Sequence, residues 1–112
     1  MAELYELSIQ EALAALAKGE VSSVDLTEAH LARIEAANPS VQAYLTVTAE
    51  RARTDARAAD EKRRQGHTAP LLGIPIALKD IFCTNGIETT CASRILKGFV
   101  PPYDATVVQK LA

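Results

Sequence analysis

One uncharged apolar stretch in the second half of the chain constrains its fold most. Gly73 and Pro75 interrupt the backbone at the start of this stretch, and residues 76–78 follow as an apolar run without charge. A short apolar run bounded by such residues is typical of a buried strand. The sequence therefore predicts a buried strand that ends at Lys79 and is followed at once by Asp80.

Lys79 stands where this predicted strand would leave the protein interior. Burial disfavours the charged ammonium of a lysine, and only the neutral amine can accept a proton as a general base. These residues alone leave two interpretations open, because structural ion pairs resemble functional sites. Lys79 is either a catalytic base at the edge of a dry region or an ordinary surface lysine paired with Asp80.

The residues before this stretch carry the signals of a first helix. Ser8 and Glu11 have the spacing of a capping box, in which each side chain binds the backbone N–H of the other residue. Gly19 is a helix stop. The spacing of four and three residues predicts one apolar stripe, made of Ile9, Leu13 and Leu16.

Two further helices are predicted before residue 66. Ser22 and Asp25 start a second helix, which is expected to end at Ala37, before Asn38 and Pro39. His30 lies on the apolar face of this helix and is interpreted as a packing residue. Residues 49–65 are rich in alanine and charge and predict a third helix, with an Asp60–Arg64 pair and a solvated basic face.

The predicted strands lie on either side of the third helix. Residues 41–47 are rich in strand formers and predict a first strand, and the stretch ending at Lys79 predicts a second. Thr84-Asn85-Gly86 predicts a turn, and Asp104 is a plausible N-cap for a last helix. Two strands separated by a helix predict an α/β fold with a parallel or mixed sheet covered by helices.

Composition excludes several functions for the 112 residues. The net charge of −2 and the pI of about 5.6 give no basic surface for binding nucleic acid unaided. No apolar run is long enough to span a membrane, and the acidic residues 1–6 do not resemble a signal peptide, so a cytoplasmic location is expected. Cys83 and Cys91 are expected to be free thiols, and with His30 and His67 they match no metal-ligand spacing. A thiol nucleophile at Cys91 remains an alternative that lacks an evident base.

Three motifs resemble the amidase signature family: residues 73–80 with Lys79, Thr89-Thr90-Cys91-Ala92-Ser93, and residues 99–108 from Phe99 to Val108. The resemblance covers essentially the whole chain and is strongest to the A subunits of tRNA-dependent amidotransferases, which act on Glu-tRNA(Gln) or Asp-tRNA(Asn). It implies an α/β/α amidase-signature sheet, incomplete here. Residues 1–112 would be the N-terminal portion of one amidase domain, with a helical lead-in at 1–40 and the start of the sheet and the Lys79 region at 41–112.

The resemblance implies that Lys79 is the lysine of a Ser–cis-Ser–Lys triad. The two catalytic serines of the family lie in a Gly/Ser-rich segment after the lysine, and the five serines of this chain do not match it, namely Ser8, Ser22, Ser23, Ser40 and Ser93. The chain is therefore expected to hold one triad member and to be inactive by itself.

The implied activity is hydrolysis of glutamine to supply ammonia for converting Glu-tRNA(Gln) to Gln-tRNA(Gln). The implied partners are glutamine, companion subunits in a heterotrimer, and misacylated tRNA bound through the complex, with no membrane. ATP and magnesium would belong to a companion subunit, because no phosphate-binding Gly-rich loop is present in this chain. Two alternatives stay open: part of a general amide hydrolase, or a short interaction module without catalytic activity.

Overall fold

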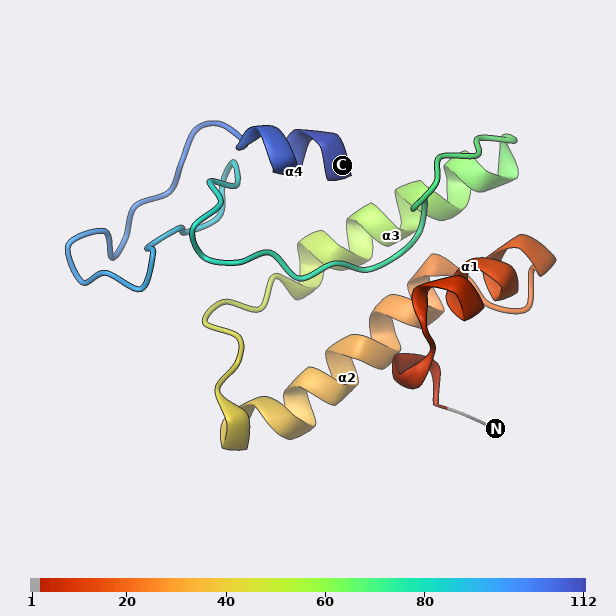
Figure 1. The fold of residues 1–112 in the computed structure, drawn as a ribbon, viewed down its shortest axis with the longest axis horizontal. Coiled ribbons are helices and arrows are strands. Elements are labelled where there is room, and N and C mark those ends of the chain that lie inside the picture. Colours follow the sequence, from red (N-terminus) through yellow and green to blue (C-terminus); the bar gives the residue numbers. More distant parts are fainter. Residues whose placement is uncertain (1–2) are drawn as a thin grey trace. The chain divides into compact units, whose positions relative to one another are not determined.

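The computed structural model describes residues 3–112, and the N-terminal residues 1 and 2 of the expected acidic start lie outside this range. Its elements are a 3-10 helix η1 (Leu4–Glu6) and four α-helices, which are α1 (Ile9–Lys18), α2 (Ser23–Val41), α3 (Ala49–Arg64) and α4 (Thr106–Leu111) (Figure 1). The chain divides into two compact units, one ending at Pro75 and the other running from Ile76 to Ala112.

The capping box of α1 forms as the sequence predicts. The Ser8 hydroxyl accepts a hydrogen bond from the backbone N–H of Glu11 at 3.2 Å, and the Glu11 carboxylate accepts one from the backbone N–H of Ser8 at 2.8 Å. Gly19 ends the helix with a left-handed φ of 71°. The predicted stripe is confirmed at Leu16, which is buried, and Leu13 is partly buried, but it is wrong at Ile9, which is 55% exposed, and Ala12 is buried beside Leu16 instead.

The core of the first unit is small and lies between helices. Its buried residues are Ala12, Leu16 and Leu26, and Leu26 is only 1% exposed. Partly buried side chains pack around these three, namely Leu4, Leu7, Val21 and Ile74. Burial of apolar surface is the main stabilising contribution to such a unit, so the core joins α1 and α2 to the segment that leads to Lys79.

Helix α2 starts at the predicted capping box of Ser22 and Asp25 but ends later than expected. It continues through Pro39 to Val41, and the left-handed Gln42, with φ of 50°, ends it. Asn38 helps to hold this end, because its side chain binds both the backbone N–H and the carbonyl oxygen of Tyr44.

The predicted strand at residues 41–47 is absent from the described chain. Val41 belongs to α2, and the following residues form a loop in which Leu45 is 70% exposed. A strand needs a neighbouring strand to receive its backbone hydrogen bonds, and no such partner lies among residues 3–112. Its strand-forming side chains therefore do not decide its conformation.

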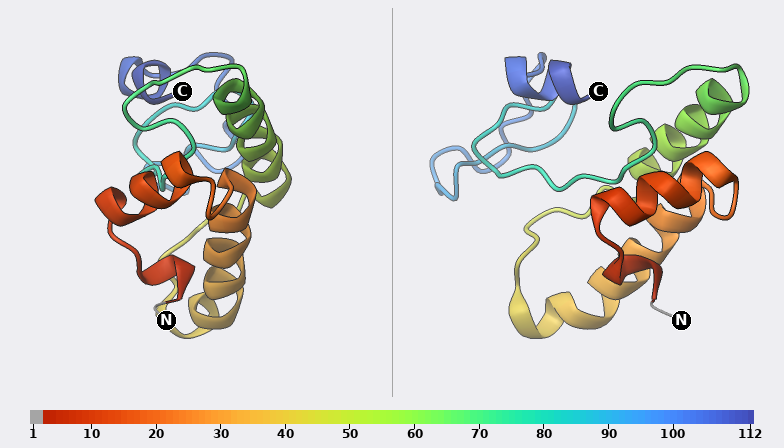
Figure 2. Two further views of the ribbon diagram at one scale, coloured as in Figure 1. Left: turned by 90° about the vertical axis from the view of Figure 1, so that its right-hand side faces the viewer. Right: turned by 45° about the vertical axis from the view of Figure 1, so that its right-hand side comes forward.

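Helices α2 and α3 pack side by side in opposite directions (Figures 1 and 2). Ala56 is buried on α3, as its helical spacing with Ala52 and Ala59 suggests. The guanidinium of Arg53 on α3 binds both carboxylate oxygens of Glu28 on α2, at 2.6 and 3.2 Å. This bidentate geometry is the strong form of an ion pair and adds orientation to the helix contact.

The predicted Asp60–Arg64 pair is wrong. Arg64 pairs with Glu61 at 2.8 Å instead. The Asp60 carboxylate accepts hydrogen bonds from the backbone N–H groups of Ser23 at 2.7 Å and Val24 at 3.2 Å. A carboxylate is most stabilising at a helix N-terminus, where N–H groups lack partners, so Asp60 joins the last turns of α3 to the start of α2.

The second unit is mostly irregular before α4. The predicted turn at Thr84-Asn85-Gly86 is confirmed by a single bridge between Thr84 and Ile87. Backbone hydrogen bonds join residues 86–89 to residues 99–101 in this unit. The Thr89 N–H donates to the Phe99 carbonyl and the Gly86 N–H donates to the Pro101 carbonyl, both at 3.0 Å. The unit is therefore organised by turns and side-chain contacts.

The predicted buried strand before Lys79 is also wrong. Residues 74–79 have no regular secondary structure, and Ile76 and Leu78 are 58% and 38% exposed. The reason is again the lack of a paired strand within residues 3–112. The helical part of the expected α/β fold is confirmed, and its strands are not formed in the described part of the chain.

Two features are absent from residues 3–112. No helix there is long and apolar enough to cross a membrane. No group of three or more His, Cys, Asp or Glu side chains there is arranged to hold a metal ion, and Cys83 and Cys91 are free thiols.

Candidate functional site around Lys79

The segment that carries Lys79 begins in the first unit. The backbone carbonyl of Gly73 accepts a hydrogen bond from the Ser23 hydroxyl at 2.8 Å, and Ser23 is buried at the start of α2. Gly73 has a φ of 91°, a conformation that side chains rarely adopt, and a Cβ added there would meet Leu16 and Ser23 at 3.4 Å. The positive φ therefore favours glycine at this position, since contacts of 3.4 Å are ordinary van der Waals distances.

Lys79 belongs to the second unit, and its side chain is exposed. Its backbone carbonyl accepts a hydrogen bond from the Phe82 N–H at 3.0 Å. The structure gives no hydrogen bond between Lys79 and a serine hydroxyl within residues 3–112. The dry surroundings expected of a neutral lysine are not formed by this unit.

Asp80, the next residue, binds a turn ten residues further along the chain. Its carboxylate accepts hydrogen bonds from the backbone N–H of Thr90 at 2.8 Å, from the Thr90 hydroxyl, and from the backbone N–H of Ala92 at 3.1 Å. Its backbone carbonyl accepts a fourth, from the Cys91 N–H at 2.9 Å. One residue thus receives four hydrogen bonds from three consecutive residues.

Residues 90–93 form a tight turn. The Ser93 N–H donates to the Thr90 carbonyl at 2.8 Å, and the two central residues, Cys91 and Ala92, have left-handed φ values of 51° and 56°. Two left-handed central residues define a type I′ turn, which glycine and asparagine favour. Here a cysteine and an alanine adopt it, so the surrounding hydrogen bonds must hold the turn in place.

These contacts change the interpretation of the Lys79–Asp80 pair. The hydrogen bonds from the Thr90 side chain and backbone and from the Ala92 backbone lower the pKa of the Asp80 carboxyl below its ordinary value. These hydrogen bonds therefore favour the charged carboxylate, which is the form that accepts them from the turn. The ordinary alternative, a surface ion pair of Lys79 with Asp80, is not among the ion pairs of the described chain.

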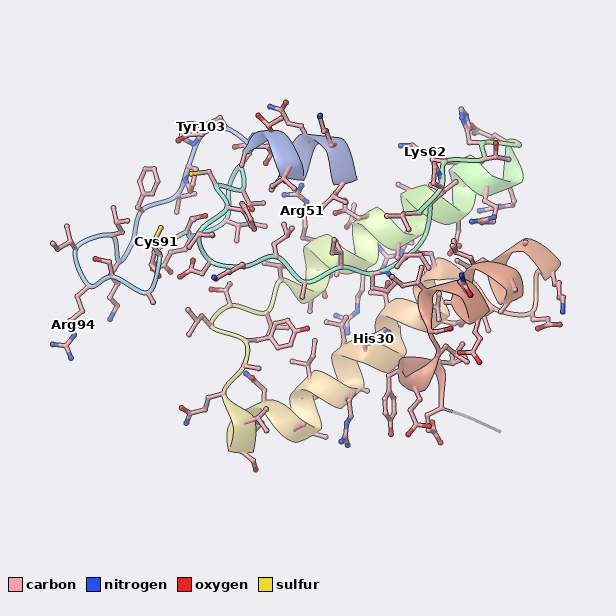
Figure 3. The ribbon with its side chains drawn as sticks, in the orientation of Figure 1. His30, Arg51, Lys62, Cys91, Arg94 and Tyr103 are labelled. Carbon is pink, nitrogen blue, oxygen red and sulfur yellow. The ribbon has the colours of Figure 1, made fainter. Side chains whose placement is uncertain are left out.

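Two further carboxylates of this unit accept hydrogen bonds from backbone N–H groups. The Glu88 carboxylate accepts a hydrogen bond from the Gly98 N–H at 2.8 Å, and the Asp104 carboxylate accepts one from the Asn85 N–H at 2.7 Å. Asp104 is therefore not the N-cap of α4, which is Ala105 without a side-chain cap. Figure 3 shows the Cys91 and Arg94 side chains on the segment between Glu88 and Gly98.

The Cys83 thiol lies beside the Tyr103 hydroxyl. The Cys83 Sγ and the Tyr103 hydroxyl are 3.5 Å apart, and the hydrogen bond with the Cys83 thiol raises the pKa of Tyr103. The segment 95–103 is largely exposed, including Ile95 at 93%, whereas Pro101 is fully buried. None of these contacts includes Lys79.

Other residues singled out in the sequence lie away from this site. His30 is half-buried on α2 (Figure 3), in keeping with a packing role. Ser8 and Ser22 are helix caps, and Ser93 accepts from the Ile95 N–H at 3.2 Å. A hollow of about 680 Å³, lined by α2, the start of α3 and the loop between them, contains no residue of the 73–93 region.

Comparisons with known proteins give this geometry a family. The family model of the amidases matches residues 25–112. The chain is 54% identical over 112 residues to the A subunit of glutamyl-tRNA(Gln) amidotransferase from Chloroflexus aurantiacus, covering 99% of this chain and 23% of the relative. It is 59% identical over 109 residues to the same protein of Geobacter metallireducens, covering 97% of this chain and 22% of the relative.

A solved structure agrees with these relatives. It belongs to a vestigial protein complex described as revealing the evolutionary origins of an s-triazine catabolic enzyme. Its TM-score is 0.88 at 34% identity, and the match covers 94% of this chain and 23% of the other. The chain thus spans about a quarter of the length of the proteins it matches.

The chain belongs to the amidase family. Within that family it is highly similar to the A subunit of glutamyl-tRNA(Gln) amidotransferase over nearly its whole length.

Proposed function

We propose that this chain is part of the glutamine-hydrolysing A subunit of a tRNA-dependent amidotransferase. The observation that carries the proposal is the identity of 54–59% to the named relatives over 97–99% of the chain. The motif from Gly73 to Asp80 lies inside the region that matches the amidase family model. The proposed activity is that of the whole subunit, of which this chain spans about a quarter.

In the proposed reaction Lys79 is the general base. Neutral Lys79 accepts a proton from a cis-serine, which in turn takes the proton of the nucleophilic serine. That serine forms a bond to the side-chain carbonyl carbon of glutamine, the C–N bond breaks, and ammonia leaves with the proton. Water then hydrolyses the glutamyl ester, which releases glutamate and restores the serine.

The exposure of Lys79 bears on where this reaction takes place. A lysine becomes a base when its ammonium is desolvated, and the unit from Ile76 to Ala112 leaves Lys79 exposed. Neither serine of the proposed triad is matched among the serines of this chain. We therefore expect residues 1–112 alone to lack glutaminase activity.

The proposed partners follow from the same relatives. Glutamine is the substrate, and the ammonia passes to companion subunits of a cytoplasmic heterotrimer that converts Glu-tRNA(Gln) to Gln-tRNA(Gln). ATP and magnesium act in a companion subunit, and no cofactor is proposed for this chain. Misacylated tRNA is bound through the complex.

The test is glutamine hydrolysis by the intact protein in its complex. Lys79→Ala removes the amine, and Lys79→Arg keeps a charge but supplies a group that does not act as a base. Both variants are expected to lose at least about 100-fold in kcat, the contribution of a general base. Lys97→Arg is the matched control, because Lys97 is exposed in the same unit and outside the 73–93 region. Wild-type hydrolysis by Lys79→Ala would refute the proposal.

A second candidate is hydrolysis of another amide by a general amidase. The observation in its favour is the match to a complex related to an s-triazine catabolic enzyme. A panel of small amides separates the two candidates, because a tRNA-dependent amidotransferase is expected to prefer glutamine. Turnover of simple aliphatic or aromatic amides at rates above that of glutamine would favour the general amidase. The third alternative, an interaction module, predicts no turnover of any amide by the intact protein.

A further inference from the structure

The residue after Lys79 makes more hydrogen bonds than either of the two comparable acids of its unit. Asp80 receives three hydrogen bonds at its carboxylate and one at its backbone carbonyl, all from residues 90–92. The Glu88 and Asp104 carboxylates each accept one backbone N–H, from Gly98 and Asn85 respectively. Asp80 is therefore the main contact between the Lys79 segment and the 90–93 turn.

The turn needs this contact because its backbone is strained. Cys91 and Ala92 both have left-handed φ values, although neither is a glycine. Residues in such conformations persist only where their surroundings hold them. The Asp80 carboxylate accepts hydrogen bonds from the backbone N–H groups of Thr90 and Ala92, and the Asp80 backbone carbonyl accepts one from the Cys91 N–H. Asp80 therefore contacts all three residues.

Asp80 and Lys79 share a peptide bond, so the position of the turn and the position of the Lys79 backbone are linked. A planar peptide and one intervening Cα leave few soft torsions between the carboxylate and the lysine Cα. We infer that Asp80 is a positioning residue, which fixes the Lys79 backbone against the 90–93 turn and so sets where the amine meets its proton donor. This inference rests on the proposed role of Lys79 as the base.

The first measurement compares Asp80→Asn with wild type in the intact complex, with glutamine as substrate. Asn has nearly the same shape but replaces one acceptor oxygen with an NH₂ group. We expect kcat to fall about 10- to 100-fold, the effect of a misplaced catalytic group, with KM for glutamine unchanged within about twofold, since Asp80 acts on the base and not on binding. Asp104→Asn makes the same chemical change in the same unit and is expected to keep the wild-type kcat.

The second measurement asks whether the effect passes through the turn. In Asp80→Asn, the amide hydrogens of Thr90 and Ala92 are expected to exchange with solvent faster than in wild type. Adding Cys91→Gly and Ala92→Gly supplies residues that adopt left-handed φ freely. We expect this triple variant to recover most of the lost kcat, because the turn then forms without the carboxylate.

Several results would overturn the inference. A wild-type kcat in Asp80→Asn, unchanged exchange at Thr90 and Ala92, or no recovery by the glycines would each refute it while the proposed function stands. A loss of folded protein that accounts for all of the lost activity would show a purely structural role. If Lys79→Ala keeps wild-type hydrolysis, the proposed function fails, and the positioning role fails with it.

Discussion

Removal of the Asp60 carboxylate should loosen the start of α2, which binds the segment that leads to Lys79. Asp60 on α3 accepts hydrogen bonds from the N–H groups of Ser23 and Val24, the first two residues of α2. Asp60→Ala removes both acceptors and leaves the buried Ser23 without this partner for its N–H. The same Ser23 holds the Gly73 carbonyl through its hydroxyl.

The expected cost follows from these two contacts. A hydrogen bond to a charged group contributes about 1.5–3 kcal/mol, and loss of an N-terminal cap costs about 0.5–2 kcal/mol. Asp60 is half-buried, and the Ser22–Asp25 capping box remains in the variant, so the lower ends of these ranges apply. We expect local destabilisation of about 2 kcal/mol, which corresponds to roughly 30-fold faster opening at about 1.4 kcal/mol per factor of ten.

Amide hydrogen exchange in the intact protein measures this local opening. Exchange of the first-turn amides of α2 should accelerate about 30-fold in Asp60→Ala, since exchange reports local opening free energies. The control is Asp55→Ala on the same helix, because the Asp55 side chain is 65% exposed and its i,i+4 pair with Arg51 is worth about 0.3–0.5 kcal/mol. Equal exchange in the two variants would refute the capping role of Asp60.

Three further perturbations test other parts of the structure. Leu26→Ala should lower the free energy of unfolding by about 2–5 kcal/mol, because Leu26 is 1% exposed in the core. Ile9→Ala should lower it by less than about 1 kcal/mol, because Ile9 is 55% exposed. Thermal unfolding of both variants measures the difference, and equal midpoints would contradict the assignment of Leu26 to the core. Gly73→Ala should cost about 1–3 kcal/mol, since its φ of 91° strains any side chain, and an unchanged unfolding midpoint would contradict it. Hydrogen bonds from Thr90 lower the pKa of Asp80 below its ordinary value of 3.8, so the stability they contribute is fully present above that pH and is lost as the pH falls through the lower pKa of the folded state. The unfolding midpoints of wild type and Asp80→Asn should therefore differ above about pH 4 and converge in acid. A difference that stays constant with pH would contradict this.

The helices could be predicted because their signals are local. The capping boxes at Ser8 and Ser22 and the stop at Gly19 act within one turn of chain, and each forms as the sequence indicates. The same reasoning failed at the end of α2, where a proline in the last turn does not stop the helix. Strand propensity at 41–47 and 76–78 also failed, because a strand requires a partner that residues 3–112 do not supply.

The candidate site was predicted only in part. The sequence singles out Lys79 and the residues 89–93, but spacing alone does not connect them. Asp80 links the two, and its signal was only its place beside Lys79, which favoured an ion pair instead. Asp60 shows the same limit, because its long-range bond to Ser23 replaced the expected local pair with Arg64.

The most direct test of the proposed role of Lys79 supplies ammonia to the intact protein in the proposed amidotransferase complex, with Lys79→Ala in place. If Lys79 serves only to release ammonia from glutamine, formation of Gln-tRNA(Gln) from glutamine should fall at least about 100-fold. Formation of the same product from added ammonium chloride should equal that of wild type. Wild-type activity with glutamine, or equal loss with glutamine and with ammonium, would contradict the assignment of Lys79 as the base of a glutamine-hydrolysing site.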